Sequence, residues 1–119
     1  MKPRPPGKRS RTDEEEERAS LLGLGLAAQQ LRHGAGMSRE AVGRRGDLAG
    51  STISRVEKGL KKEPRWETMR RLAKGLGVEV GDLVRLAVEL APGEAGDRLR
   101  QREGVNAEYR RSLRKRKQA

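Results

Sequence analysis

The chain has 119 residues, of which 33% are hydrophobic and 38% are charged, and it contains no Phe. Such a chain can bury only a small core, so we expect one compact helical domain with loose ends. The net charge of +11 favours a polyanionic partner, either nucleic acid or an anionic membrane surface. The lack of cysteine excludes disulfides and thiol catalysis, and one His without clustered carboxylates argues against a zinc site.

No apolar run approaches the roughly 20 residues that a bilayer-spanning helix needs. The basic N-terminal residues are not followed by the apolar segment of a signal peptide. We therefore expect a soluble, cytoplasmic protein with no membrane-inserted part.

The first expected elements are a disordered basic arm over residues 1–11 and a helix that begins at Thr12 or Asp13. Each of these two residues has a Glu three positions later, which is the spacing of a capping box. The helix continues to His33, because one face keeps apolar residues at helical spacing. These residues are Leu21, Leu24, Ala28 and Leu31.

Two short helices follow, over about 39–45 and 50–58, and a turn at Gly46 to Leu48 joins them. Ser38 is the expected N-cap of the first of the two. Gly43 lies where the two backbones come close. Apolar residues fall where two steeply crossing helices need contacts, at Val42, Leu48, Ile53 and Val56. This pattern is typical of a DNA-binding helix-turn-helix.

After a basic loop at 59–64, a fourth helix is expected over 65–76, and Gly77 ends it. Its inward face carries Trp66, Met69, Leu72, Ala73 and Leu76, and Trp66 is expected to be a core anchor or a packing surface for Arg65. A fifth helix is expected over 80–90, with Leu83, Val84 and Ala87 pointing inward.

Most of the net charge lies near the C-terminus, since residues 98–119 carry nine Lys or Arg against two Glu. Beyond Gly93 the apolar residues are too sparse to make a buried face, so we expect broken helix at best. The expected organisation is an arm over 1–11, a domain over 12–92 with its helix-turn-helix at about 38–58, and a basic, largely disordered tail over 93–119.

Several short stretches share the order and spacing of one known domain. They are Leu24-Gly25, Met37-Ser38, the run STISRVEKG at 51–59, Pro64-Arg65-Trp66, Leu72-Ala73, Leu76-Gly77-Val78 and Asp82-Leu83. Through them, Leu24 to Val84 resembles the helix-turn-helix domain of the XRE family, the Cro and phage-repressor type. The resemblance implies an all-α, five-helix lambda-repressor-like DNA-binding domain.

The resemblance also implies a role for particular residues. The third helix would enter the major groove, with base contacts from Gly50, Ser51, Thr52, Ser54 and Arg55. Only Arg55 has the length and fork to read guanine bidentately. The DNA backbone and minor groove would be held by Arg39, Lys58, Lys61, Lys62 and Arg65, of which Arg65 is the minor-groove residue. Glu57 is expected to be structural.

Three residues depart from the family pattern. Gly46 stands at a position that is usually apolar, and Asp47 replaces the usual turn glycine. Asp tolerates the left-handed conformation, so the turn is expected to persist. Ala49 replaces the usual Ser or Thr N-cap of the third helix, which should cost about 1 kcal/mol of stability.

No catalytic constellation, phosphate loop or cofactor motif is present in the sequence, so we expect no enzyme activity and no cofactor. The expected function is a sequence-specific transcriptional repressor that binds double-stranded DNA at an inverted repeat. A homodimer is expected, through Leu86, Val88 or Leu90. The alternatives are a protein-interaction module, such as an antitoxin or a coactivator, and a non-specific nucleic-acid binder driven by the basic tail.

Overall fold

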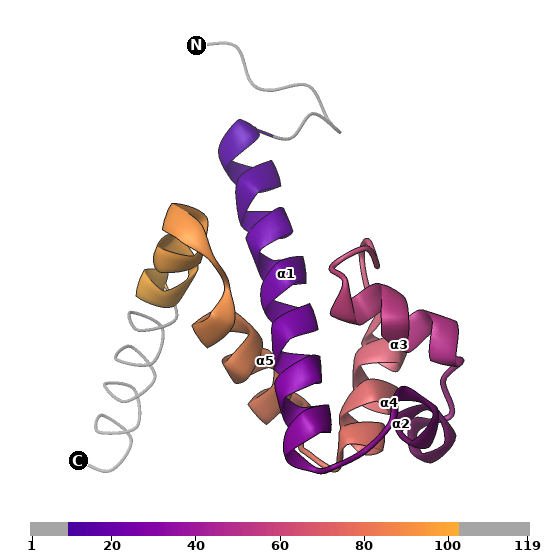
Figure 1. Ribbon diagram of the computed structural model, residues 1–119. Helices are drawn as coiled ribbons and strands as arrows, with labels where there is room; N and C mark the ends of the chain where they lie inside the picture. Colours follow the sequence, from indigo (N-terminus) through magenta and orange to yellow (C-terminus); the bar gives the residue numbers. More distant parts are fainter. Residues whose placement is uncertain (1–9, 103–119) are drawn as a thin grey trace, which may run out of the picture.

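The computed structural model describes residues 10–102, and every regular element in that range is a helix. The helices follow in the order α1 (Arg11–Gly34), α2 (Arg39–Gly46), α3 (Gly50–Glu57), α4 (Trp66–Leu76) and α5 (Val80–Leu90), and a further helical stretch covers 93–102. In Figure 1, α1 runs through the middle, with α2, α3 and α4 on one side and α5 on the other. The all-helical prediction is confirmed, but residues 10–102 contain one helix more than the five expected.

α1 begins earlier than the sequence indicates, because Ser10 caps it. The Ser10 Oγ accepts a hydrogen bond from the Asp13 N–H at 3.0 Å, and the Asp13 carboxylate accepts one from the Ser10 N–H. This reciprocal pair is a capping box. The expected caps, Thr12 and Asp13, lie within the first turn, since three overlapping residue pairs have capping-box spacing. The other helix ends lie within one residue of those expected.

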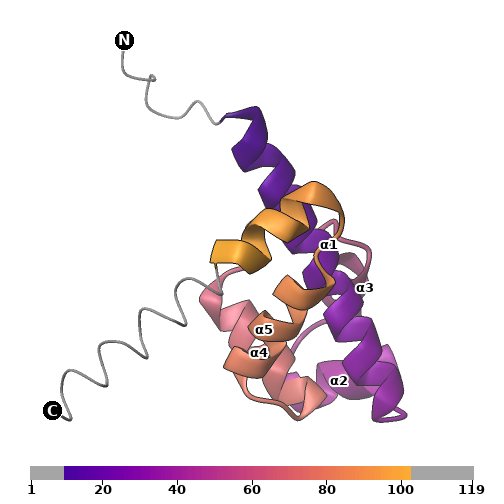
Figure 2. The ribbon, with the colours of Figure 1, turned by 90° about the vertical axis from the view of Figure 1, so that its left-hand side faces the viewer.

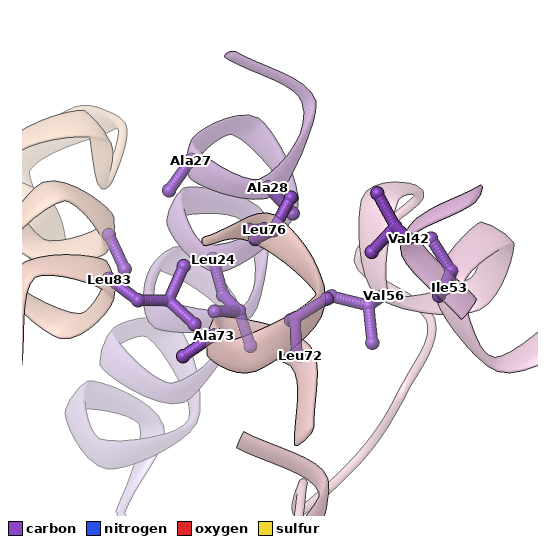
Figure 3. Close-up of a cluster of buried hydrophobic side chains, with 11 residues drawn as sticks. Leu24, Ala27, Ala28, Val42, Ile53, Val56, Leu72, Ala73, Leu76 and Leu83 are labelled. Carbon is purple, nitrogen blue, oxygen red and sulfur yellow. The ribbon is translucent and has the colours of Figure 1, made fainter. Parts of the chain in front are cut away.

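The buried side chains form one main cluster that draws residues from α1 to α5 (Figure 3). Its largest fully buried members come from α2, α3, α4 and α5: Val42, Ile53, Val56, Leu72 and Leu83. The predicted burial of Val42, Ile53, Val56, Leu72 and Leu76 is therefore confirmed. This cluster fixes α3 against the rest of the fold through its inner face.

Two residues that we expected in the core are exposed. Trp66 is 67% exposed, because it is the first residue of α4 and helical side chains tilt towards the helix N-terminus. Trp66 is thus exposed at the start of α4, and the core-anchor prediction is wrong. Val84 is 42% exposed because the buried face of α5 runs through Leu83 and Ala87. The apolar stripe of α5 is wider than the face that it buries.

Glycines allow the helices to approach closely around α2 and α3. A Cβ added at Gly25 of α1 would lie 2.6 Å from the carbonyl oxygens of Val56 and Glu57, at the end of α3. A Cβ at Gly46 would lie 2.2 Å from the Arg71 carbonyl oxygen, so α2 and α4 pack backbone to backbone. Gly43 was expected where the backbones of α2 and α3 come close, but its close backbone contact is with the turn: an added Cβ would lie 2.6 Å from the Leu48 carbonyl oxygen, and α3 contributes only the Ile53 side chain, at 3.3 Å.

The stretch 93–102 packs back onto α1, as Figure 2 shows, where it crosses α1 in orange. Small apolar residues make the contact: Ala19, Ala91 and Ala95 are buried together, with Leu99 beside them. The Arg98 Nε donates to the Glu16 Oε1 at 3.2 Å, and Arg102 forms a second ion pair with the same carboxylate. These two arginines, Arg102 first, lower the pKa of Glu16. The expectation of broken helix beyond Gly93 is therefore wrong for residues 93–102.

The remaining parts of the expected tails, residues 1–9 and 103–119, lie outside the described residues. The N-terminal arm, the disorder of the C-terminal tail and the division of the chain into three regions stay predictions.

Candidate nucleic-acid interface

Hydrogen bonds and one left-handed residue build the turn between α2 and α3. The Ser38 Oγ accepts from the Ala41 N–H at 3.0 Å, which confirms Ser38 as the N-cap of α2. Asp47 follows α2 in the left-handed conformation, with φ 58° and ψ 51°. The Leu48 N–H then donates to the Gly43 carbonyl at 2.9 Å. The turn thus persists without its usual glycine, as the sequence predicts.

α3 buries one side and presents the other to solvent. Ile53 and Val56 are 1% and 2% exposed, so the helix is firmly seated in the core. The residue before it, Ala49, provides no side-chain cap. The five residues expected to contact bases are all at least partly accessible: Gly50, Ser51 and Arg55 are exposed, and Thr52 and Ser54 are half-buried. Their contact with DNA stays a prediction.

Arg55 differs from the other residues of α3 in that it is both long and unengaged. Its side chain is exposed, and its guanidinium makes no hydrogen bond or ion pair with any residue from 10 to 102. A free guanidinium fork can donate two parallel hydrogen bonds to the O6 and N7 of guanine in the major groove. α3 therefore presents one long side chain that has no partner among residues 10–102.

The buried carboxylate of Glu57 joins the first three helices. Arg32 of α1 donates to both oxygens, from Nε to Oε2 at 3.0 Å and from Nη2 to Oε1 at 2.9 Å. Arg39 of α2 donates from Nε to Oε2 at 3.3 Å. The Arg32 Nη1 also donates to the Met37 carbonyl at 3.1 Å. The predicted structural role of Glu57 is confirmed, whereas no sequence pattern indicated Arg32, whose partner lies 25 positions away.

Arg39 is tethered by this network but keeps free donors. Its side chain is 43% exposed, and only its Nε is bonded within residues 10–102. It stands at the first residue of α2, where unpaired backbone N–H groups favour an anion. Glu57 therefore holds Arg39 at the N-terminal end of α2 and leaves the rest of its guanidinium accessible.

The loop after α3 is fixed to α1. The Gly59 carbonyl accepts a hydrogen bond from the Arg18 Nη1 at 2.8 Å, and the Leu60 N–H donates to the Arg55 carbonyl at 2.8 Å. The loop cations expected to contact the DNA are at the surface: Lys58, Lys62 and Arg65 are exposed, and Lys61 is half-buried. The sequence did not indicate this contact of Arg18, because an arginine that follows an acidic run has the pattern of an ordinary surface charge.

The Lys and Arg residues at positions 44–65 lack carboxylate partners in the described part of the chain, whereas most of the other described cations have one. Within residues 10–102, no carboxylate pairs with the cations of positions 44–65, namely Arg44, Arg45, Arg55, Lys58, Lys61, Lys62 and Arg65. The other described cations, apart from Arg18 and Lys74, are paired: Arg11, Arg32, Arg39, Arg70, Arg71, Arg85, Arg98, Arg100 and Arg102. Positive charge is therefore left unneutralised on the helix-turn-helix and its loop.

The described range offers neither a membrane span nor a metal cluster. No helix within residues 10–102 is long and apolar enough to cross a bilayer. No group of three or more His, Cys, Asp or Glu side chains in the same range is placed to hold a metal ion.

Comparison with known proteins agrees with this geometry. A family model described as a helix-turn-helix domain matches residues 24–87, which is more than half of the chain. The matched region begins in α1 and ends in α5, so it includes the turn, α3 and the basic loop. No curated protein and no solved structure matches the chain. The chain belongs to the helix-turn-helix domain family.

Proposed function

We propose that the protein is a sequence-specific transcription regulator of the XRE type that represses by occupying its operator. α3 enters the major groove, where Arg55 reads a guanine and Gly50, Ser51, Thr52 and Ser54 lie against the bases. Phosphates are bound by Arg39, Lys58, Lys61 and Lys62, and Arg65 enters the minor groove. The observation that carries the proposal is that the cations of positions 44–65, on the helix-turn-helix and its loop, have no carboxylate partner within residues 10–102.

The proposed operator is an inverted repeat bound by two copies, with half-sites about one helical turn, roughly 34 Å, apart. Leu86 and Leu90 pack against the main core, so they have less surface for a dimer contact than the sequence suggests. Selection of bound DNA from a random pool tests the dimer directly. A palindromic product is expected, and a single isolated half-site would contradict it.

Base recognition is tested by fluorescence anisotropy with the selected site and a scrambled one. Arg55→Ala should weaken binding to the selected site by about 1–3 kcal/mol and change binding to scrambled DNA little. Lys61→Ala should weaken both alike, since a phosphate contact carries no sequence information. Equal wild-type affinity for both DNAs at moderate salt would contradict sequence specificity.

Deletion of residues 105–119 separates this proposal from binding driven by the tail alone. If the helix-turn-helix binds the DNA, the deletion should weaken binding to all sequences alike and reduce the salt dependence. Abolished binding to every DNA would instead assign the affinity to the tail.

A further inference from the structure

The loop between α3 and α4 carries several of the cations proposed to contact DNA, but it has few contacts of its own. Lys61 and Lys62 lie in its middle. Within residues 10–102, the backbone of residues 61–64 makes no hydrogen bond. Glu63 has a left-handed backbone, with φ 46°, which is uncommon for a residue other than glycine. The position of the two lysines therefore depends on how the residues before them are fixed.

Arg18 of α1 fixes the start of this loop, which lies beside the first half of α1 (Figure 1). The Arg18 Nη1 donates to the Gly59 carbonyl oxygen at 2.8 Å. Gly59 also packs on α1, since a Cβ added there would lie 3.0 Å from the Leu22 Cδ2. The next residue, Leu60, donates its N–H to the Arg55 carbonyl at 2.8 Å. The last hydrogen-bonded residues before the lysines are thus held by α1 and by the end of α3.

Arg18 makes this bond although a carboxylate stands at ion-pair spacing on its own helix. Glu14 lies four residues earlier on α1, yet no carboxylate pairs with Arg18 within residues 10–102. Arg18 also lies before residue 24, so the first half of α1 adds this contact to the helix-turn-helix domain. A groove of about 500 Å³ between α1 and the loop is lined by both Arg18 and Lys62. The bond therefore crosses from α1 to the loop next to a proposed phosphate-binding lysine.

Fixing a loop before it binds increases affinity without any new contact. A loop that is already ordered loses less conformational entropy on its partner than a mobile loop does. Hydrogen bonds from a charged donor, such as the one from the guanidinium to the Gly59 carbonyl, are among the stronger ones in proteins. Because phosphate contacts carry no sequence information, the gain from an ordered lysine loop should be the same for every DNA sequence.

We propose that Arg18 is a positioning residue for DNA binding. It holds the loop through the Gly59 carbonyl, so that Lys61 and Lys62 meet the phosphates without first having to be ordered. Arg18 acts through the loop and does not itself contact the DNA. This inference rests on the proposed function, because it concerns the same phosphate contacts.

The affinity of Arg18→Ala for the selected and the scrambled duplex, measured by fluorescence anisotropy, tests the proposal. Arg11→Ala is the matched control, because Arg11 lies about two turns earlier on the same helix and pairs only with the exposed Glu15 within residues 10–102. Each variant removes one positive charge. Arg18→Ala should bind both duplexes about two- to tenfold more weakly than Arg11→Ala, the range expected for one hydrogen bond. Equal affinities of the two variants would overturn the proposal.

A second background separates positioning from a direct contact between Arg18 and DNA. In Lys61→Ala/Lys62→Ala protein, adding Arg18→Ala should change the affinity by less than about twofold, because the side chains that Arg18 positions are gone. The same fold loss in both backgrounds would mean that Arg18 binds a phosphate itself or supports the whole fold. Either reading would rule out the positioning role.

Amide hydrogen exchange of the free protein reports on the loop without DNA. The Leu60 N–H should exchange about two- to tenfold faster in Arg18→Ala than in Arg11→Ala, and the Val56 N–H in α3 should exchange equally in both. Unchanged exchange at Leu60 would overturn the positioning role. If the wild-type protein bound neither duplex, the proposed function would fail and this inference with it. Normal wild-type binding with no specific effect of Arg18→Ala would remove this inference alone.

Discussion

Gly46 shows how one residue can depart from a family pattern for a structural reason. The usual apolar side chain would need space that the α4 backbone occupies, since an added Cβ would lie 2.2 Å from the Arg71 carbonyl oxygen. α4 contributes its own glycine to the same contact, because a Cβ at Gly75 would lie 2.4 Å from the Val42 carbonyl oxygen. The two glycines set the distance between α2 and α4, and thus the position of the turn that precedes α3.

We predict that Gly46→Ala lowers the free energy of unfolding by about 1–3 kcal/mol, because α2 and α4 must separate to admit the methyl group. Gly34→Ala is the matched control, since nothing lies within 4 Å of an added Cβ there. It should leave stability unchanged or raise it by up to about 1 kcal/mol. Urea unfolding measures both changes. Equal effects of the two substitutions would show that the close contact is not limiting.

Glu57 is the second residue whose environment dictates a clear outcome. Its carboxylate is fully buried between Arg32 and Arg39, so Glu57→Gln removes the charge that neutralises them while keeping the side-chain shape. Breaking a buried pair on one side costs more than the pair contributes when intact. We predict a loss of about 3 kcal/mol in the free energy of unfolding. Denaturant titration measures it.

Glu40→Gln provides the reference for this change, because Glu40 is exposed on α2. It should alter stability by no more than about 0.5 kcal/mol. If Glu57→Gln behaved like Glu40→Gln, the three-helix junction would contribute little to the fold.

Among the elements, α3 is held by its buried face and by the Glu57 ion pairs, and it lacks a side-chain N-cap, since Ala49 supplies none. Ala49 has the extended backbone of an N-cap, with φ −65° and ψ 142°, so a serine there could bond the first turn. We predict that Ala49→Ser stabilises the protein by about 1 kcal/mol in thermal or urea unfolding. Ser38→Ala, which removes the existing cap of α2, should destabilise it by a similar amount. Two shifts of the same sign would contradict this assignment of the caps.

The sequence predicts α2 to α5 well, because most of them have local signals at their ends. Ser38 caps α2, Asp47 tolerates the left-handed turn, and Gly77 ends α4 with φ 77°. Periodicity also identifies the core face of α3 through Ile53 and Val56. Local spacing could not choose among the overlapping capping pairs of α1. It also could not show that Trp66, the first residue of α4, is exposed.

The stretch 93–102 was missed because its contacts are made by small and distant residues. Ala19, Ala91 and Ala95 form the second cluster, and alanine does not mark an apolar stripe in a sequence. Arg98 and its partner Glu16 are 82 positions apart, so no local pattern indicates their pairing. Contacts between residues far apart in the sequence also limit what could be predicted of the candidate site. α3 and its loop could be read from the sequence, whereas Arg18 and Arg32 act through partners far along the chain.

On the scale of the whole molecule, binding of a polyanion depends less on the net charge than on which cations are already paired with carboxylates of the protein. In α4, Glu67 pairs with both Arg70 and Arg71, and Arg70 first, then Arg71, lowers the pKa of Glu67. Lys61 and Lys62, a few residues earlier, have no carboxylate partner within the described range. A polyanion would therefore displace no internal ion pair on binding the lysines, but it would compete with Glu67 for the arginines.

Two double variants that remove equal charge separate these effects. Lys61→Ala/Lys62→Ala and Arg70→Ala/Arg71→Ala each reduce the net charge from +11 by two. On duplex DNA, the logarithm of the affinity falls linearly with the logarithm of the salt concentration. Each phosphate that the protein neutralises increases the steepness of this line by about 0.9. We predict that this steepness decreases by up to about 2 for the lysine variant and changes little for the arginine variant, measured by anisotropy from low to moderate salt. Equal decreases would mean that the overall field, and not the unpaired cations beside α3, drives association.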